Sequence, residues 1–251
     1  MSLAVLGCKL DDIDAEAATE HILEFVRTNA HAQVVTLGTE MVVYAQRDTA
    51  FRSVINEAAL VLCDTIGLLL GARLRGSRLQ ERVTGVDLIA RLCNAAGAQG
   101  YGIYLLGGAP GVAEGAARVL QQRFPALRIR GTQHGYFSDE DSPAVVAAIK
   151  AAGADILFAG LGFPRQEFWI AKHLPATGCN VALGVGGSLD VLSGNVQRAP
   201  ERWRRLGLEW LYRLYREPQR WRRQLALPYF VLLVMFDSAR LLIRRFGAAS
   251  P

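Results

Sequence analysis

Apolar residues between positions 30 and 190 follow two alternating patterns. Short runs rich in β-branched residues alternate with longer stretches in which apolar residues recur at helical spacing, as in βα units around a parallel sheet. The predicted helices include Asp14–Arg27, Asp87–Ala96 and Gly111–Arg123. The predicted strands are Gln33–Thr36, Leu60–Cys63, Gly102–Leu106, Arg128–Thr132, Asp155–Gly160 and Asn180–Val185. We therefore expect an α/β fold with a Rossmann-like, mostly parallel sheet flanked by helices.

Polar residues and glycines follow nearly every predicted strand. Thr36 ends the first strand, Asp64 follows the second, and Gly107 and Gly108 follow the third. Gly162 and the segment 184–190 follow the last two strands. Open α/β sheets bind ligands at the carboxyl ends of their strands. These residues are therefore expected to gather around one ligand.

The charge of the chain is distributed unevenly. Residues 1–197 hold 16 Lys or Arg and 19 Asp or Glu, whereas residues 198–251 hold 12 Arg and four acids. In the second segment tryptophan, tyrosine and leucine alternate with arginine at helical spacing. We therefore divide the chain into an α/β domain, 1–197, and a basic amphipathic helical appendage, 198–251.

The appendage has the composition of a helix that lies on an anionic membrane surface. Its uncharged stretch, Leu225–Phe236, is 12 residues long, against the roughly 20 that span a bilayer, so it is expected to dip in. Two alternatives remain. The helix packs on the domain, or it is a basic arm for nucleic acid, which the long aliphatic stretch disfavours.

The rest of the composition indicates one reduced, cytosolic domain. The four cysteines are far apart and form no CxxC pair, and no internal repeat or linker is evident. The N-terminal apolar run lacks a preceding basic region and is followed by acids, unlike a signal peptide. The four histidines show no metal-ligand spacing, so we predict no metal site.

Each chemical motif also has a structural interpretation. Asp64 is either a cap for the helix that follows it or a catalytic base. The Thr36 hydroxyl either satisfies a neighbouring backbone group or binds a sugar or phosphate. The glycines of LLGGAPG, Leu105–Gly111, either form a tight turn or cradle a phosphate.

Two further segments resemble capped helix starts. Thr84 and Asp87 in ERVTGVDL fit an N-cap and a first-turn acid, although Arg82 beside them is harder to explain in that way. In GFPRQE, Pro164 opens a helix and leaves Gln166 and Glu167 either to cap it or to face a ligand.

Taken together, these motifs resemble the WecG/TagA/CpsF glycosyltransferases of bacterial surface-polymer synthesis. The resemblance covers about residues 30–225 and implies that residues 1–197 form a nucleotide-sugar-binding catalytic domain. Its markers are LVLCDTIG, RVTGVDL, LLGGAPG, GTQHGYF, GLGFPRQE, VGGSLDVLSG, RAPERW and GLEWLYRLYREPQRWRR. It implies an inverting, metal-independent enzyme without a cofactor, which moves a sugar from a UDP-sugar to an undecaprenyl-diphosphate-linked saccharide. The family's donors include N-acetylmannosamine, its uronic acid and hexoses such as glucose.

The resemblance also implies roles for individual residues. The catalytic aspartate of the family falls on Asp64 and its active-site threonine on Thr36. RVTGVDL adds Arg82, Thr84 and Asp87 as substrate contacts. The expected nucleotide contacts are Gly107, Gly108, Tyr136, Gln166 and Asp190. The tail arginines expected to neutralise the leaving diphosphate, once the tail docks at the membrane, are Arg213, Arg220 and Arg223.

Two residues depart from the family pattern. Gly38 stands where an asparagine is usual, and Thr65 stands where glycine is common. Both are expected to line the sugar site, so they favour a donor other than N-acetylmannosamine.

The expected partners are the UDP-sugar, the polyprenyl-diphosphate-linked acceptor and an anionic membrane surface, with no nucleic acid, and a homo-oligomer is left open. The expected location is peripheral, on the cytoplasmic face of the inner membrane. The main alternative is a non-catalytic protein that binds UDP-sugars or lipid diphosphates. A nucleotide-dependent oxidoreductase is disfavoured because GxGxxG is absent.

Overall fold

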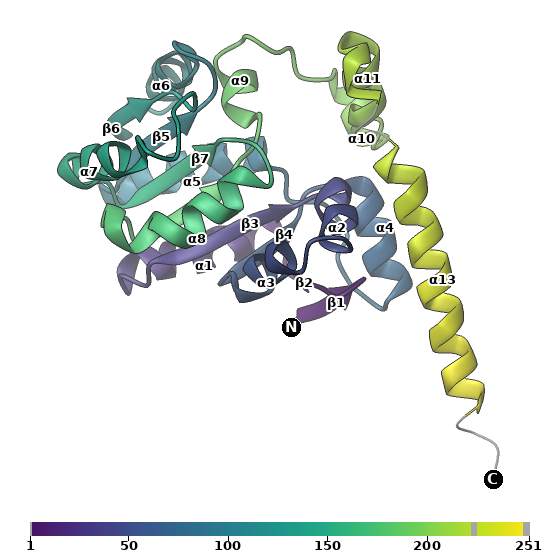
Figure 1. The fold of residues 1–251 in the computed structure, drawn as a ribbon. Helices are drawn as coiled ribbons and strands as arrows, with labels where there is room; N and C mark the ends of the chain where they lie inside the picture. Colours follow the sequence, from purple (N-terminus) through teal and green to yellow (C-terminus); the bar gives the residue numbers. More distant parts are fainter. Residues whose placement is uncertain (1, 222–224, 248–251) are drawn as a thin grey trace.

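The chain forms a parallel sheet of six strands covered by helices on both faces (Figure 1). The computed structural model describes residues 2–221 and 225–247, without the side chains of Arg220 and of residues 239–247. The strand order is β4-β3-β8-β7-β5-β6, and every neighbouring pair is parallel. The strands of this sheet are β3 (Ala32–Leu37), β4 (Leu60–Cys63), β5 (Gly102–Gly107), β6 (Arg128–Gln133), β7 (Ile156–Gly160) and β8 (Val181–Gly184).

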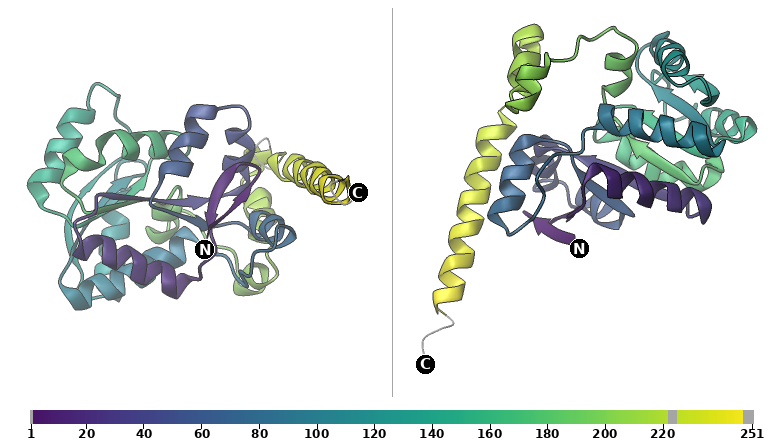
Figure 2. Two further views of the ribbon diagram at one scale, coloured as in Figure 1. Left: turned by 90° about the horizontal axis from the view of Figure 1, so that it is seen from below. Right: turned by 180° about the vertical axis from the view of Figure 1, so that it is seen from behind.

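The helices of the domain connect these strands and form two layers. They are α1 (Ala15–Arg27), α2 (Thr39–Ala45), α3 (Thr49–Glu57), α4 (Ile66–Leu74), α5 (Gly85–Gln99), α6 (Val112–Arg123), α7 (Ser142–Ala152), α8 (Arg165–Thr177) and α9 (Ser188–Leu192). Buried residues of α1, α5, α6 and α9 pack on one face of the sheet. Those of α2, α3, α4, α7 and α8 pack on the other. Figure 2 shows the two layers from below and from behind.

The six predicted strands are all present, and their ends differ by at most one residue from the prediction. The sheet is wholly parallel, which sharpens the expectation of a mostly parallel one. Every residue of β4, β5 and β8 is buried, because helices cover both faces. Continuous apolar runs are the sequence signature of such strands.

An N-terminal hairpin, which the sequence pattern does not predict, precedes the first helix. Strands β1 (Ser2–Val5) and β2 (Cys8–Asp11) pair antiparallel around a turn at Leu6 and Gly7, both with positive φ. The Asp11 carboxylate accepts a hydrogen bond from Val61 N at 2.9 Å. The apolar run at the N-terminus is therefore a strand that packs on the domain beside the edge strand β4.

Residues after 198 fold into further helices beside α2 and α4, and the C-terminal part of the last helix extends past the domain (Figure 1). They are α10 (Glu201–Arg205), α11 (Glu209–Arg216), the 3-10 helix η1 (Pro218–Arg220) and α13 (Ala226–Gly247). Helix α13 packs on α2 and α4, and its Phe230 and Val234 are buried in the domain core. Of the alternatives for this segment, the structure thus supports a helix packed on the domain for one face of α13.

Glycines of α4 allow the close approach of α13. A Cβ atom at Gly67 would lie 2.8 Å from Leu227, and one at Gly71 would lie 2.9 Å from Phe230. The opposite face of α13 remains apolar and exposed, at Val231, Leu232, Met235 and Phe236 among others. No helix in the described part of the chain is long and apolar enough to cross a membrane.

Candidate active site

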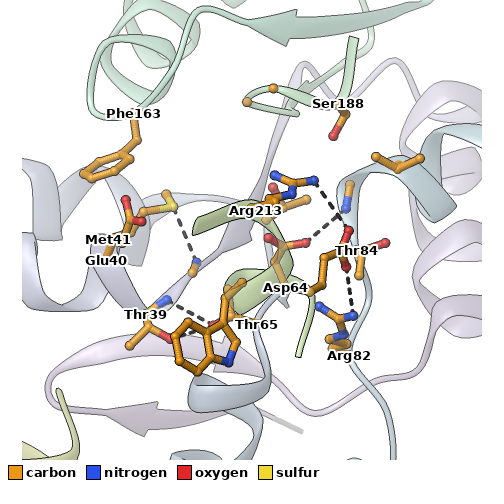
Figure 3. A pocket seen from close by; sticks show the side chains of 18 of the residues that line it. Thr39, Glu40, Met41, Asp64, Thr65, Arg82, Thr84, Phe163, Ser188 and Arg213 are labelled. Carbon is orange, nitrogen blue, oxygen red and sulfur yellow. Dashed lines mark hydrogen bonds and ion pairs between the residues drawn. The ribbon is translucent and has the colours of Figure 1, made fainter. Parts of the chain in front are cut away.

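A cavity of about 280 Å³ lies over the carboxyl ends of β3, β4 and β8. Thr36 on β3 lines it, as do Asp64 and Val185, which directly follow β4 and β8, and the first residues of the neighbouring helices α2, α4 and α5. Two elements from the C-terminal segment close the cavity, with Arg213 on α11 and Leu227 on α13. Figure 3 shows Asp64, Thr84, Arg82 and Arg213 together on one side, with Met41 and Phe163 opposite them.

Asp64 is held at the cavity wall by backbone contacts on both sides. Its N–H donates to Leu37 O at 3.0 Å, which continues the pairing of β4 with β3. Its Oδ1 accepts from Gly85 N at 3.1 Å, at the first residue of α5. Of the two roles predicted for Asp64, the cap of the following helix is therefore wrong. The N-cap residue of α4 is Thr65, and no side chain makes a capping hydrogen bond there. The carboxylate is partly open to the cavity.

The surroundings of Asp64 suit a base. Burial raises its pKa to about 6, while the Gly85 hydrogen bond, Arg82 and Arg213 oppose that rise and Glu209 adds to it. At neutral pH most of the carboxylate is therefore ionised, yet it binds a proton more readily than an ordinary aspartate. General bases act best with a pKa near the working pH.

Thr36 is buried near the end of β3, and its hydroxyl donates a hydrogen bond to a backbone carbonyl of the neighbouring strand. Its Oγ1 donates to Gly184 O at 2.8 Å and links β3 to β8. The hydroxyl also lines the cavity, where its lone pairs can accept a hydrogen bond. The structure thus shows the backbone contact that was one of the two expected roles.

The motif around Thr84 forms a capped helix start with an added arginine. Thr84 is the N-cap of α5, and its hydroxyl donates to Asp87 Oδ2 at 2.7 Å. Arg198 donates hydrogen bonds to both carboxylate oxygens of Asp87, at 2.7 and 2.6 Å, and also lines the cavity. Arg82 and Thr84 also line the cavity, whereas Asp87 does not.

Gln166 at the start of α8 lines the cavity and forms a buried pair with the next residue, Glu167. Its Nε2 donates to Glu167 Oε1 at 2.7 Å, and its Oε1 accepts from Gly186 N at 3.0 Å. The Glu167 Oε2 atom is buried without a hydrogen-bond partner. Burial raises the pKa of Glu167 to about 7. The pair fixes the orientation of the Gln166 amide and the loop after β8.

The two residues that depart from the family pattern touch each other. A Cβ atom at Gly38 would lie 3.4 Å from the Thr65 methyl group. The Thr65 hydroxyl lies 2.7 Å from that of Thr39 and accepts from Thr39 N at 3.1 Å. All three line the cavity. The Thr65 methyl group thus lies next to the site where the Cβ atom of a larger residue at position 38 would stand.

Four of the expected nucleotide contacts lie away from the cavity lining, namely Gly107, Gly108, Tyr136 and Asp190. The glycine pair has a structural explanation. A Cβ atom at Gly107 would lie 2.4 Å from Gly160 O, and one at Gly108 would lie 2.5 Å from Val112. These glycines therefore allow β5 to approach β7 and the start of α6.

The three tail arginines are described to different extents. Arg213 lines the cavity, with its Nη2 3.5 Å from Glu209 Oε1. Arg220 ends η1, and its side chain lies outside the described residues, as does the whole of Arg223. Helix α11 places Arg213 in the cavity lining in this structure, and completion of the site at a membrane stays a prediction.

Sequence reasoning missed Arg198 and Glu209, which both line the cavity. Their ion pairs join segments more than 100 residues apart, and no local pattern marks such pairs. In the described part of the chain, no group of three histidine, cysteine or acidic side chains is placed to hold a metal. The metal-free site stays a prediction.

Comparison with known proteins agrees with these features. The sequence model of the Glycosyl transferase WecG/TagA/CpsF family matches residues 3–243. The chain is 35% identical over 230 residues to an N-acetylglucosaminyldiphosphoundecaprenol N-acetyl-beta-D-mannosaminyltransferase of Bacillus spizizenii, covering 90% of this chain and 89% of that protein. A protein of the same name from Staphylococcus aureus is 33% identical over 229 residues, with the same coverage of both chains.

Proposed function

Because this chain belongs to the WecG/TagA/CpsF family of glycosyltransferases, we propose that it moves a sugar from a UDP-sugar to an undecaprenyl-diphosphate-linked saccharide. The transfer inverts the anomeric carbon, needs neither metal nor cofactor, and serves the synthesis of a bacterial cell-surface polysaccharide. The names of these relatives support a lipid-linked acceptor for this chain.

One observation carries the proposal for the chemistry. A single carboxylate with a raised pKa, Asp64, shares a cavity with three guanidinium groups, those of Arg82, Arg198 and Arg213. An inverting transfer needs one base for the attacking hydroxyl and positive charge for the departing diphosphate. Arginine forks suit phosphate oxygens.

In the proposed reaction, Asp64 takes the proton of the acceptor hydroxyl while the hydroxyl oxygen attacks the anomeric carbon of the donor. The new glycosidic C–O bond forms on the face opposite the leaving group, and the bond from that carbon to the UDP oxygen breaks. UDP leaves with the electron pair. The arginines stabilise the negative charge that develops on its diphosphate.

The donor sugar of the relatives, N-acetylmannosamine by their name, is one candidate for this chain. Its uronic acid and a hexose such as glucose are the others. Gly38 and Thr65 favour the latter group, because both line the cavity and change its shape and its polar groups.

We also propose that the protein works at the cytoplasmic face of the inner membrane as a peripheral protein. The exposed apolar side chains of α13 support this location, since such a surface suits a lipid layer. A shallow apolar groove lined by Leu227, Pro228, Val231 and Leu232 lies on the same helix, and Leu227 also lines the main cavity. An acceptor that carries a long lipid would need such a path.

A panel of UDP-sugars tested with lipid-linked N-acetylglucosamine and glucose acceptors, with products identified by mass, tests the proposal. We expect one UDP-sugar to add one sugar to one acceptor. UDP-sugar binding without turnover for any pair would instead favour a non-catalytic binding protein.

A further inference from the structure

Glu209 is a buried carboxylate at the junction between the C-terminal helices and the domain. It opens α11, and it is the one buried residue in that helix, with 6% of its surface exposed. Every other residue of α11 keeps more contact with solvent. A charge is costly to bury unless it is paired. The position of Glu209 therefore depends on its partners.

Three guanidinium groups surround the Glu209 carboxylate, from three separate segments of the chain. Arg82 Nη2 donates to Oε2 at 3.0 Å. Arg213 Nη2 lies 3.5 Å from Oε1, and Arg198 Nε lies 3.9 Å from the same oxygen. The Arg198 Nε atom is buried and has no hydrogen-bond partner. Glu209 thus joins the loop before α5, the segment before α10 and α11.

All four of these side chains also line the main cavity. Within the cluster, three guanidinium groups face three carboxylates, those of Asp64, Asp87 and Glu209. Asp87 pairs with Arg198, whereas Arg82 and Arg213 both pair with Glu209. Without Glu209, Arg82 and Arg213 would each lose this ion pair, and Asp64, the base, would be the acid left near them.

We propose that Glu209 is a positioning residue for sugar transfer, which holds Arg82 and Arg213 at the cavity so that their guanidinium groups meet the diphosphate of the donor. This inference rests on the proposed function. In the proposed reaction, Glu209 does not touch the reacting atoms. It acts through the two arginines and through its charge on the base.

The action of the Glu209 charge on Asp64 can be measured as a shift of the pH profile, which a purely structural residue would not cause. Its negative charge raises the pKa of Asp64, whereas Arg82 and Arg213 lower it. Removing the Glu209 charge should therefore lower the pKa of the base. The titratable and charged groups that act on Asp64 from its neighbouring elements are Cys63, Arg82, Arg198, Glu209 and Arg213.

Three variants of the full chain test the proposal: Glu209→Gln, Glu209→Asp and, as a control, Glu201→Gln. Gln keeps an oxygen for Arg82 but loses the charge, and Asp keeps the charge on a shorter side chain. Glu201 is exposed on α10 and pairs with Arg205, one turn further along the same helix. For each variant, kcat and KM for the UDP-sugar are measured from pH 5 to pH 8, together with the thermal midpoint and the Kd of UDP.

We expect Glu209→Gln to lower kcat at least tenfold, with a smaller change in KM, and to move the acid limb of kcat/KM to lower pH. Glu209→Asp should restore part of kcat and the position of the limb, and Glu201→Gln should match the wild type. The proposal is overturned if Glu209→Gln keeps kcat within twofold of the wild type. It is also overturned if both Glu209 variants lose activity equally with an unmoved acid limb.

The same data separate this inference from the proposed function. A wild type that transfers sugar, beside an unaffected Glu209→Gln variant, contradicts the positioning role alone. A wild type that binds UDP but transfers no sugar from any UDP-sugar overturns both.

Discussion

Replacing Asp64 with asparagine should make the protein more stable while it removes the base. The pKa of Asp64 is about 6 in the fold, against the ordinary 3.8. The folded state therefore binds this proton more tightly than the unfolded state, and at pH 7 the ionised carboxylate destabilises the fold. Asn carries no charge, and its oxygen can still accept from Gly85 N.

The magnitude follows from the shift. About two pKa units at about 1.4 kcal/mol each give a ceiling of about 3 kcal/mol. Because Asp64 is partly open to the cavity, we expect about 1–2 kcal/mol. The sign of the linkage also predicts a pH dependence. The advantage of Asp64→Asn should be full above pH 7, shrink as pH falls through 6, and be small near pH 4, where the folded wild type is protonated.

Urea unfolding of both proteins between pH 4 and pH 8 measures this difference, with Asp139→Asn as a control at an exposed loop position outside the cavity lining. The reasoning would be refuted if Asp64→Asn were less stable than the wild type at pH 7. A gap that stays constant from pH 8 to pH 4 would also contradict it, since the effect would not come from this titration.

Three other predictions concern separate parts of the molecule. Gly71→Leu should lower the free energy of unfolding by about 1–3 kcal/mol, measured in urea, because its Cβ alone would lie 2.9 Å from Phe230. Gly38→Asn and Thr65→Gly should act non-additively on kcat/KM for a panel of UDP-sugars, since the two positions touch; additive effects would contradict the coupling. Glu167→Gln should flatten the loss of stability between pH 4.5 and pH 7, because the raised pKa of about 7 means that the fold loses stability as pH rises through this range. An unchanged stability profile would place that titration elsewhere.

The strands could be predicted from the sequence because burial on both faces demands continuous apolar runs. Leu60–Cys63 has the bounds that the pattern predicted. The gathering of Thr36 and Asp64 in one cavity follows from the parallel topology, since each lies at or directly after the end of a strand. The short β1–β2 hairpin lacks such a signal.

The rest of the site depends on contacts that no local pattern encodes. Gly107 and Gly108 have the composition of a phosphate turn, but their Cβ space is filled by Gly160 and Val112. The composition of α13 is typical of a membrane-surface helix, yet Phe230 completes the domain core. That packing depends on which small residues α4 presents, and periodicity within α13 itself does not reveal it.

The most direct test of the central claim compares sugar transfer and UDP binding in Asp64→Asn. Transfer from the active UDP-sugar to the lipid-linked acceptor is measured by product mass, and the Kd of UDP by calorimetry. A positioned general base contributes about 10²–10⁴ in rate. We predict that Asp64→Asn binds UDP within a few-fold of the wild type and transfers sugar at least 100-fold more slowly. Transfer at the wild-type rate would contradict the assignment of Asp64 as the base.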